Sequence, residues 1–289
     1  MTQAGPERLV AVPVRHYGRW LSAVVVLAAL GWLGLAFSRA DIDYGVTGEF
    51  FTAQNVIQGA GRTLLLSVLA QAMGIALGVL FAVMRLSHNP VTSSVAWFYI
   101  WLFRGTPVLV QLLIWYNLAL VFPTIAGQPT SDLMTPFLAA LLGLGINEGA
   151  YMAEIVRSGI GSVDEGQTEA SQALGMTRAQ TLRRVVLPQA MRVIIPPTGN
   201  EFINMLKTSS LAYTIQYSEL LLSAVSVYTN NLRVIELLFT VSLWYLVLTS
   251  VFSIGQYFLE RRFSRGSSRE LGPTPMSRLM TNLRGRPRL

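Results

Sequence analysis

The sequence has no cysteine, very few histidines and little charge. The absence of cysteine excludes disulfide frameworks, thiolate metal sites and cysteine nucleophiles. His16 and His88 are too few for a histidine-rich metal site, so we expect no bound metal. Charged residues make up 13% of the chain, whereas soluble domains carry about 25%. This composition excludes a typical cytosolic enzyme, a coiled coil and a disordered scaffold.

Apolar residues are abundant instead. They account for 52% of the 289 residues, and the mean hydropathy is +0.47. A membrane helix needs about 20 predominantly apolar residues. We therefore predict an all-α integral membrane protein with six spans, at residues 20–37, 63–84, 93–122, 136–156, 193–213 and 234–259. The third span contains Pro107 after Arg104, and we expect a kink there because proline removes a helix hydrogen bond.

The basic residues predict how these spans are oriented. The net charge is +7 and the isoelectric point is about 10.0, which suits either nucleic-acid binding or basic cytoplasmic loops. If both termini are cytoplasmic, 17 of the 22 basic residues lie on the cytoplasmic side, as the positive-inside rule requires. We therefore predict six spans in the cell (inner or plasma) membrane, two cytoplasmic termini and no nucleic-acid partner.

The first span has a second interpretation as a secretory signal peptide. Its basic flank and the small residues around Ala36-Phe37-Ser38 fit a cleavage site. The apolar run is longer than the usual 7–15 residues of a signal peptide, so we interpret it as an uncleaved anchor.

The loop between the fourth and fifth spans predicts two short helices. A first helix should begin at a capping box formed by Ser162–Glu165 and end before Gly175, which fits the left-handed position after a helix. A second should begin at the capping box Thr177–Gln180 and stop before Pro188. The pattern alone leaves two interpretations open, a solvated cover over the bundle or a docking element for a cytoplasmic partner.

This loop resembles the EAA motif of ABC importer permeases. That motif reads EAA, three residues, glycine, nine residues, isoleucine, one residue and then leucine-proline. The corresponding residues here are Glu169, Ala170, Ser171, Gly175, Val185, Leu187 and Pro188. The segments GAYMAEIVRSGI, LPQAMR, GNEFINMLKTSSL and RGTPVLVQ are also similar to permeases for polar amino acids, the histidine, glutamate, glutamine and arginine group. Asp164-Glu165 departs from the Pro-Lys that is common in the family.

The resemblance implies a five-helix importer core preceded by one extra span. Residues 1–58 would comprise the cytoplasmic N-terminus, the extra span and an outer linker, and residues 59–263 the permease domain, with its ATPase-coupling loop at 159–192. Residues 264–289 would form a basic, disordered cytoplasmic tail. The implied partners are an ABC ATPase dimer, a second permease subunit (a copy or a sibling), an extracytoplasmic substrate-binding protein, an amino-acid substrate and membrane lipid.

We do not expect this chain to hydrolyse ATP. A phosphate-binding loop requires G-x-x-x-x-G-K-[ST]. The single lysine, Lys207, is followed by Thr208 but preceded by Leu206, and it lies in a predicted span. No catalytic residues are therefore proposed, and no cofactor is expected on this chain. ATP and magnesium would be bound by the partner ATPase.

Several polar residues lie within the predicted spans, where a charge costs about 2.5–3.5 kcal/mol at mid-membrane. One interpretation is that they line a translocation path in which Glu148 suits the ammonium group of an amino acid. The candidates for this path are Gln111, Asn147, Glu148, Tyr151, Asn200 and Glu201. The alternative is a structural role, which we favour for Arg104, Glu154 and Lys207. Arg104 would then pair with a carboxylate, and Lys207 would reach headgroups or carbonyl groups near a helix end.

Two further expectations concern the ends of the fifth span. Pro196 and Pro197 fit the first turn of a helix better than its interior. Residues 214–233 should lie on the outer face and contain a short amphipathic helix, which would act as a lid or as a docking surface for a substrate-binding protein.

Four functions follow, in order of preference. The first is the permease subunit of an ATP-driven importer for polar amino acids. The second is a permease of the same family for a related solute such as an opine, ectoine or another amino-acid derivative. The third is an ion-coupled secondary transporter, although the sequence shows no inverted repeat of the kind common in such carriers. The fourth is a membrane-anchored signalling or scaffold protein that uses its basic tail.

Overall fold

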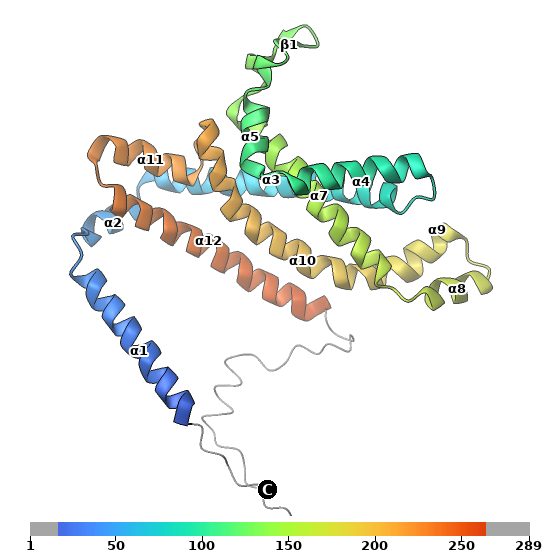
Figure 1. Ribbon diagram of the computed structural model, residues 1–289, viewed down its shortest axis with the longest axis horizontal. Helices are drawn as coiled ribbons and strands as arrows, with labels where there is room; N and C mark the ends of the chain where they lie inside the picture. Colours follow the sequence, from blue (N-terminus) through green and yellow to red (C-terminus); the bar gives the residue numbers. More distant parts are fainter. Residues whose placement is uncertain (1–16, 264–289) are drawn as a thin grey trace, which may run out of the picture. The chain divides into compact units, whose positions relative to one another are not determined.

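The computed structural model describes residues 17–263 and divides into two units, residues 1–43 and 44–289. The first unit contains α1 (Tyr17–Ser38), shown in blue in Figure 1. Every described side chain from Trp20 to the end of α1 is exposed, and the helix is long and apolar enough to cross a membrane. The first sixteen residues and the tail predicted at 264–289 lie outside the described residues.

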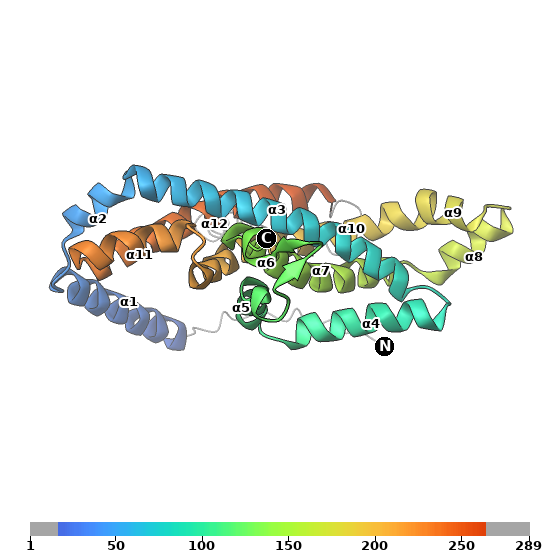
Figure 2. The same ribbon diagram turned by 90° about the horizontal axis from the view of Figure 1, so that it is seen from above.

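The described part of the second unit is helical except for one short hairpin (Figures 1 and 2). Its long helices are α3 (Gln54–Arg85), α4 (Pro90–Gly105), α7 (Pro136–Gly161), α10 (Leu187–Thr208) and α12 (Val234–Phe263). The shorter helices are α2 (Tyr44–Phe51), α5 (Val108–Tyr116), α6 (Thr130–Leu133), α8 (Glu165–Ala173), α9 (Arg178–Thr181) and α11 (Leu220–Asn231). A π-helix covers Leu182–Val186, and 3-10 helices cover Leu118–Leu120 and Ser209–Ile215. Strand β1 (Thr124–Ile125) pairs antiparallel with β2 (Gln128–Pro129).

Small residues let α3 and α7 pack closely along the core. Gly74, Gly78 and Ala82 recur every fourth residue of α3, and all three are buried. Gly145 and Gly149 are buried on the facing side of α7. A Cβ atom at Gly78 would overlap the Cβ of Met152 in α7. This small-xxx-small pattern allows two helix backbones to approach at a membrane helix interface.

Replacing Gly78 with valine is expected to lower the stability of the folded chain by about 1–3 kcal/mol, the usual cost of overpacking a filled core. A Cβ at Gly78 meets backbone atoms of Met152 and Ala153, which cannot rotate away. Gly61→Val is the matched control, because Gly61 lies in the same helix and a Cβ there meets nothing within 4 Å. Thermal unfolding of the purified transporter checks this. Equal melting temperatures for the two variants would contradict the packing account.

Length and composition identify only some of the described helices as able to cross a membrane. By these criteria α1, α3 and α12 can each cross a membrane, and α4 with α5 makes a fourth span if the bent pair counts as one. The axes of α4 and α5 differ by 100°, so the kink predicted at Pro107 is confirmed. α7 has 26 residues and α10 has 22, but both carry the polar residues that the sequence places inside the spans.

Among the shorter helices, α8 and α9 lie together at one end of the bundle, and α11 and α2 lie at the other (Figures 1 and 2). The helix predicted within residues 214–233 is confirmed as α11. Buried Glu219 caps it by accepting a hydrogen bond from the Leu222 amide at 2.9 Å. The same carboxylate accepts hydrogen bonds from Thr63 of α3 and Tyr245 of α12, so it joins three helices.

Candidate translocation cavity and coupling loop

A cavity of about 780 Å³ lies where the broken span meets α7 and α10. We call it the Glu148 cavity. Four predicted path residues line it, namely Asn147, Glu148, Tyr151 and Glu201, and so do the cationic residues Arg104 and Lys207. Two predicted path residues, Gln111 and Asn200, do not line it. The cavity therefore contains two carboxylates and two cations within the part of the chain predicted to cross the membrane.

Glu148 is held at the wall of this cavity by the close packing of α3 and α7. A Cβ at Gly74 would overlap the Glu148 side chain, so the glycine makes room for the carboxylate. The Glu148 side chain is 5% exposed, and its Oε1 has no hydrogen-bond partner among residues 17–263. Glu148 is therefore a buried acid at the wall of a cavity, and an ionisable residue in this position within a membrane span marks a candidate functional site.

Gln111 and Asn147 hold the break between α4 and α5 together. The Gln111 side-chain amide donates to the carbonyl of Phe103 at 3.0 Å and to the hydroxyl of Thr106 at 2.8 Å. The Asn147 amide donates to the same Phe103 carbonyl at 2.7 Å and to Gln111 Oε1 at 3.2 Å. These bonds satisfy a helix-end carbonyl that the break leaves without its usual partner. Gln111 thus has a structural position, whereas Asn147 contributes to both the bend and the cavity wall.

The polar residues given structural roles occupy different settings. The guanidinium of Arg104 lies 5.2 Å from the ring centroid of Tyr151. The carboxylate partner expected for Arg104 is not found among residues 17–263, because Glu154 is bound by Arg157 one turn further along α7. Lys207 is exposed in the last turn of α10 and lines the cavity, and its expected contact with headgroups or carbonyl groups stays a prediction.

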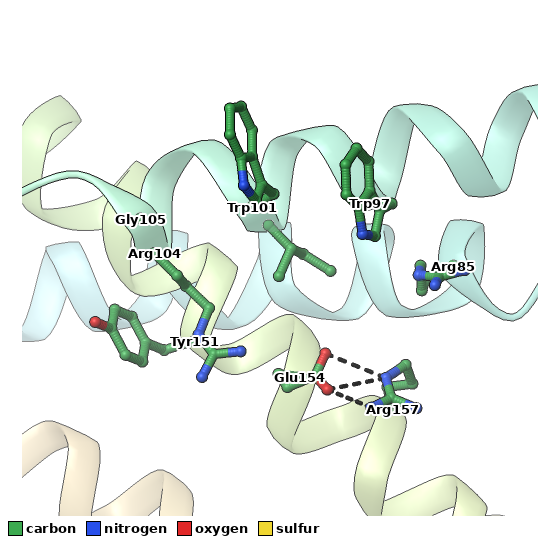
Figure 3. Close-up of a pocket in the computed structure, with 9 residues that line it drawn as sticks. Arg85, Trp97, Trp101, Arg104, Gly105, Tyr151, Glu154 and Arg157 are labelled. Carbon is green, nitrogen blue, oxygen red and sulfur yellow. Dashed lines mark hydrogen bonds and ion pairs between the residues drawn. The ribbon is translucent and has the colours of Figure 1, made fainter.

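A second pocket, of about 580 Å³, adjoins the Glu148 cavity. Figure 3 shows it lined by side chains from the ends of α3 and α7 and from one face of α4. We call it the Glu154 pocket. Its other lining residues are Arg85, Trp97, Ile100, Trp101, Arg104, Gly105, Tyr151 and Arg157. The sequence did not indicate Arg85, Trp97 or Trp101 as residues of a functional site, because residues of these types are common at the ends of membrane helices.

The loop predicted to dock an ATPase folds into two short helices. Helix α8 ends before Gly175, whose φ of +80° confirms the left-handed position. Thr177 and Gln180 form the predicted capping box, because each side chain bonds the backbone amide of the other. Glu169 and Ala170 are exposed on α8, whereas Ser171 is 5% exposed. The exposed part of this motif is therefore available to a partner, and Ser171 packs inward.

Three sequence predictions about this region are wrong. The first loop helix is capped by Asp164, which accepts from the Gly166 amide at 2.7 Å, and not by a box at Ser162 and Glu165. An aspartate placed directly before the helix satisfies the first free amides, so the box is not needed. The second helix does not stop before Pro188. It continues through the π-helix into α10, where the wider π-turn gives the proline ring room.

The third wrong prediction concerns the paired prolines. Pro196 and Pro197 lie in the interior of α10 instead of in its first turn, because α10 begins earlier than the fifth span was predicted to begin. Gln256 of α12 donates a hydrogen bond to the Pro196 carbonyl at 2.7 Å. This bond ties α10 to α12 beside the two prolines.

Comparison with known proteins identifies the family. Residues 74–265 match the family model described as "Binding-protein-dependent transport system inner membrane component". The chain belongs to this family. It is the membrane permease subunit of an ABC importer and not an enzyme, and ATP is hydrolysed by a separate ATPase subunit. Three described helices that can cross a membrane agree with its place in the inner membrane.

Individual relatives cover most of the permease. The chain is 45% identical over 275 residues to the arginine transport system permease protein ArgU of Corynebacterium glutamicum, covering 93% of this chain and 87% of that protein. It is 38% identical to the glutamine transport system permease protein GlnP of Escherichia coli strain K12, covering 72% of this chain and 92% of the relative. A solved structure of an amino acid ABC transporter with histidines superposes with a TM-score of 0.69 at 37% identity, covering 77% of this chain and all of that one.

Proposed function

We propose that this permease carries a cationic amino acid, of which arginine is the first candidate, through the Glu148 cavity. The observation that carries the proposal is the charge pattern of the cavity, where Glu148 and Glu201 face a common space with Arg104 and Lys207. The 45% identity with an arginine permease supports the same substrate class.

The cavity offers complementary groups for each charge of such a cargo. An amino acid with a cationic side chain carries two positive groups and one carboxylate. Glu148 and Glu201 would attract the positive groups, and Lys207 would attract the carboxylate. A buried charge needs a paired partner to offset its desolvation, so the buried Glu148 carboxylate favours a cargo that brings a cation. A neutral amino acid brings a single ammonium group, which can pair with only one of the two carboxylates.

We propose that this chain crosses the membrane six times with both termini in the cytoplasm, and that it pairs with a second permease subunit.

An ATPase dimer would contact the exposed residues Glu169, Ala170 and Gly175. Val185, Leu187 and Pro188 would transmit the movement of the coupling loop into α10. ATP and magnesium would bind to that ATPase, and no cofactor is proposed on this chain. A substrate-binding protein would deliver cargo at the opposite end, where α11 lies. Movement of α8 and α9 would then reach the cavity directly, because α10 contributes Glu201 and Lys207 to its wall.

A second substrate class within the same family is an amino-acid derivative such as an opine or ectoine. An opine that retains a guanidinium group fits the same charges, whereas ectoine is a compact zwitterion that needs only one carboxylate. The two acidic residues in the cavity therefore favour a dicationic cargo. Family membership removes the ion-coupled carrier and the scaffold protein from consideration.

A radiolabelled uptake panel tests the substrate class. Vesicles containing the assembled transporter and its binding protein are supplied with labelled arginine, ornithine, glutamine, glutamate and ectoine, with and without ATP inside. We expect ATP-dependent accumulation of arginine and ornithine that exceeds accumulation of the other three. Preferred uptake of glutamate or ectoine would contradict the assignment of a cationic cargo.

A further inference from the structure

The Glu148 cavity and the Glu154 pocket share three lining residues, Arg104, Gly105 and Tyr151. The Glu154 pocket lies toward the ends of α3 and α7, and α7 leads from there into the coupling loop. The two spaces are therefore consecutive along α7, and the shared residues stand at the boundary between them. Any solute that passes from the first space to the second must pass Arg104 and Tyr151.

The two boundary side chains come from different helices and meet across the path. Arg104 lies in the last turn of α4, immediately before the break, and Tyr151 lies in the middle of α7. Figure 3 shows the guanidinium of Arg104 beside the Tyr151 ring, at 5.2 Å from its centroid. A guanidinium over an aromatic face at this distance forms a cation–π contact. Both side chains are otherwise exposed to the cavities, so the contact can break without unpacking the core.

Helix α7 offers three successive sites for a cation along its surface. Glu148, Tyr151 and Glu154 are spaced three residues apart, so each lies beside the next with a rise of about 4.5 Å, and the row turns around the helix by about 60° at each step. Two are carboxylates and the middle one is an aromatic ring. In this structure a cation of the protein itself, the Arg104 guanidinium, occupies the middle site.

We propose that Arg104 and Tyr151 form the gate between the two cavities, and that a cargo cation opens it by replacing the Arg104 guanidinium on the Tyr151 ring. Arg104 then turns toward Glu154, which lines the same pocket. This inference rests on the proposed function, since it requires the path to run along α7 and the cargo to carry a cation. It makes Arg104 a specificity-determining residue, because a cargo with a cationic side chain can pair with Glu148 and displace Arg104 at the same time, whereas a neutral amino acid brings only its ammonium group.

Two pairs of variants separate the gate from a purely structural role. Tyr151→Phe keeps the aromatic face and should keep the gate closed, whereas Tyr151→Leu removes the face and should open it. Arg104→Lys keeps a cation that can approach the ring, whereas Arg104→Gln does not. If these side chains only supported the fold, the two variants of each pair would give the same access to the Glu148 cavity.

The absence of native cysteine makes the gate directly measurable. Asn204 lines the Glu148 cavity but not the Glu154 pocket, so Asn204→Cys reports on access to the space beyond the gate. In inverted vesicles containing the assembled transporter, a membrane-impermeant thiol reagent reaches this cysteine from the cytoplasmic side. We expect Tyr151→Leu and Arg104→Gln to raise the labelling rate about fivefold, the shift that loss of a partly exposed cation–π contact supports. Tyr151→Phe should not change it.

The control position is Ser158→Cys, which is exposed near the coupling end of α7 and lines neither cavity. Its labelling rate should be the same in all gate variants. Equal Asn204→Cys rates in the wild type, Tyr151→Leu and Arg104→Gln would overturn the gate, even if arginine uptake is normal.

Adding cargo separates failure of the gate from failure of the substrate assignment. With arginine present, we expect labelling of Asn204→Cys to rise in the Tyr151→Phe background and to change little in Tyr151→Leu. If the gate variants change labelling but arginine does not, the cargo-displacement part of the proposal is overturned. If arginine raises labelling equally in both backgrounds, the Tyr151 ring is not the site of exchange.

Discussion

The Glu148→Gln transporter is expected to take up a cationic amino acid at least about a hundredfold more slowly than the wild type at low substrate concentration. Glu148 is buried and its Oε1 lacks a partner among the described residues, so its carboxylate would be the natural counter-charge for the cargo. Breaking a buried charge pair costs about 3–5 kcal/mol, and each 1.4 kcal/mol corresponds to about tenfold in affinity. Initial rates of ATP-dependent uptake into vesicles measure this loss.

Two comparisons make the Glu148 result interpretable. Glutamine has nearly the same shape as glutamate, so the variant should assemble and keep its basal ATPase activity. Glu49→Gln is the matched control, because Glu49 is exposed on α2 and lines neither the Glu148 cavity nor the Glu154 pocket. Normal uptake by Glu148→Gln would remove the cavity from the cargo path. Loss of uptake by both variants would show that removal of any acidic side chain lowers uptake, and that the effect is not particular to Glu148.

The Glu169→Lys transporter is expected to lose substrate-stimulated ATP hydrolysis together with uptake. Glu169 is exposed on α8, where it would meet a basic residue of the ATPase. Truncating one member of a buried interfacial charge pair costs about 2–5 kcal/mol, and reversing its charge adds repulsion. Stimulated ATPase activity should therefore fall by at least about thirtyfold, while the permease remains folded because the Glu169 side chain is exposed.

Gln167→Lys provides the control for the coupling prediction. Gln167 is exposed on the same short helix, and its position two residues from Glu169 turns it to another face. The control should retain most of the stimulated activity, since it adds the same charge away from the docking face. Equal loss in both variants would point to unfolding of α8. Full activity in Glu169→Lys would contradict a role for this residue in coupling.

Local signals in the sequence were sufficient where one side chain acts on its own backbone. Gly175 was identified because only a residue without a Cβ adopts positive φ at low cost, and Thr177 with Gln180 because the capping box is formed within one turn. The Ser162–Glu165 prediction failed although it had the same spacing. Asp164 lay between them and caps α8 more directly, and spacing alone does not reveal which of two competing caps forms.

Long-range contacts explain what the sequence did not reveal. A polar residue in an apolar run such as Gln111 suggests a path residue, yet its amide holds the break after Phe103. The role of Glu219 depends on Thr63 and Tyr245, which are distant in sequence and meet only in the folded chain. The gathering of Glu148, Glu201 and Arg104 around one cavity likewise depends on how α4, α7 and α10 pack. The residue types were visible from the sequence, but their shared location was not.

The most direct measurement is a structure of the assembled transporter with arginine bound, determined with an ATPase variant that binds but does not hydrolyse ATP. The account predicts density for arginine in the Glu148 cavity, with one of its positive groups within hydrogen-bond distance of Glu148 and its carboxylate toward Lys207. Arginine bound elsewhere in this chain, with the Glu148 cavity closed by side chains, would contradict it.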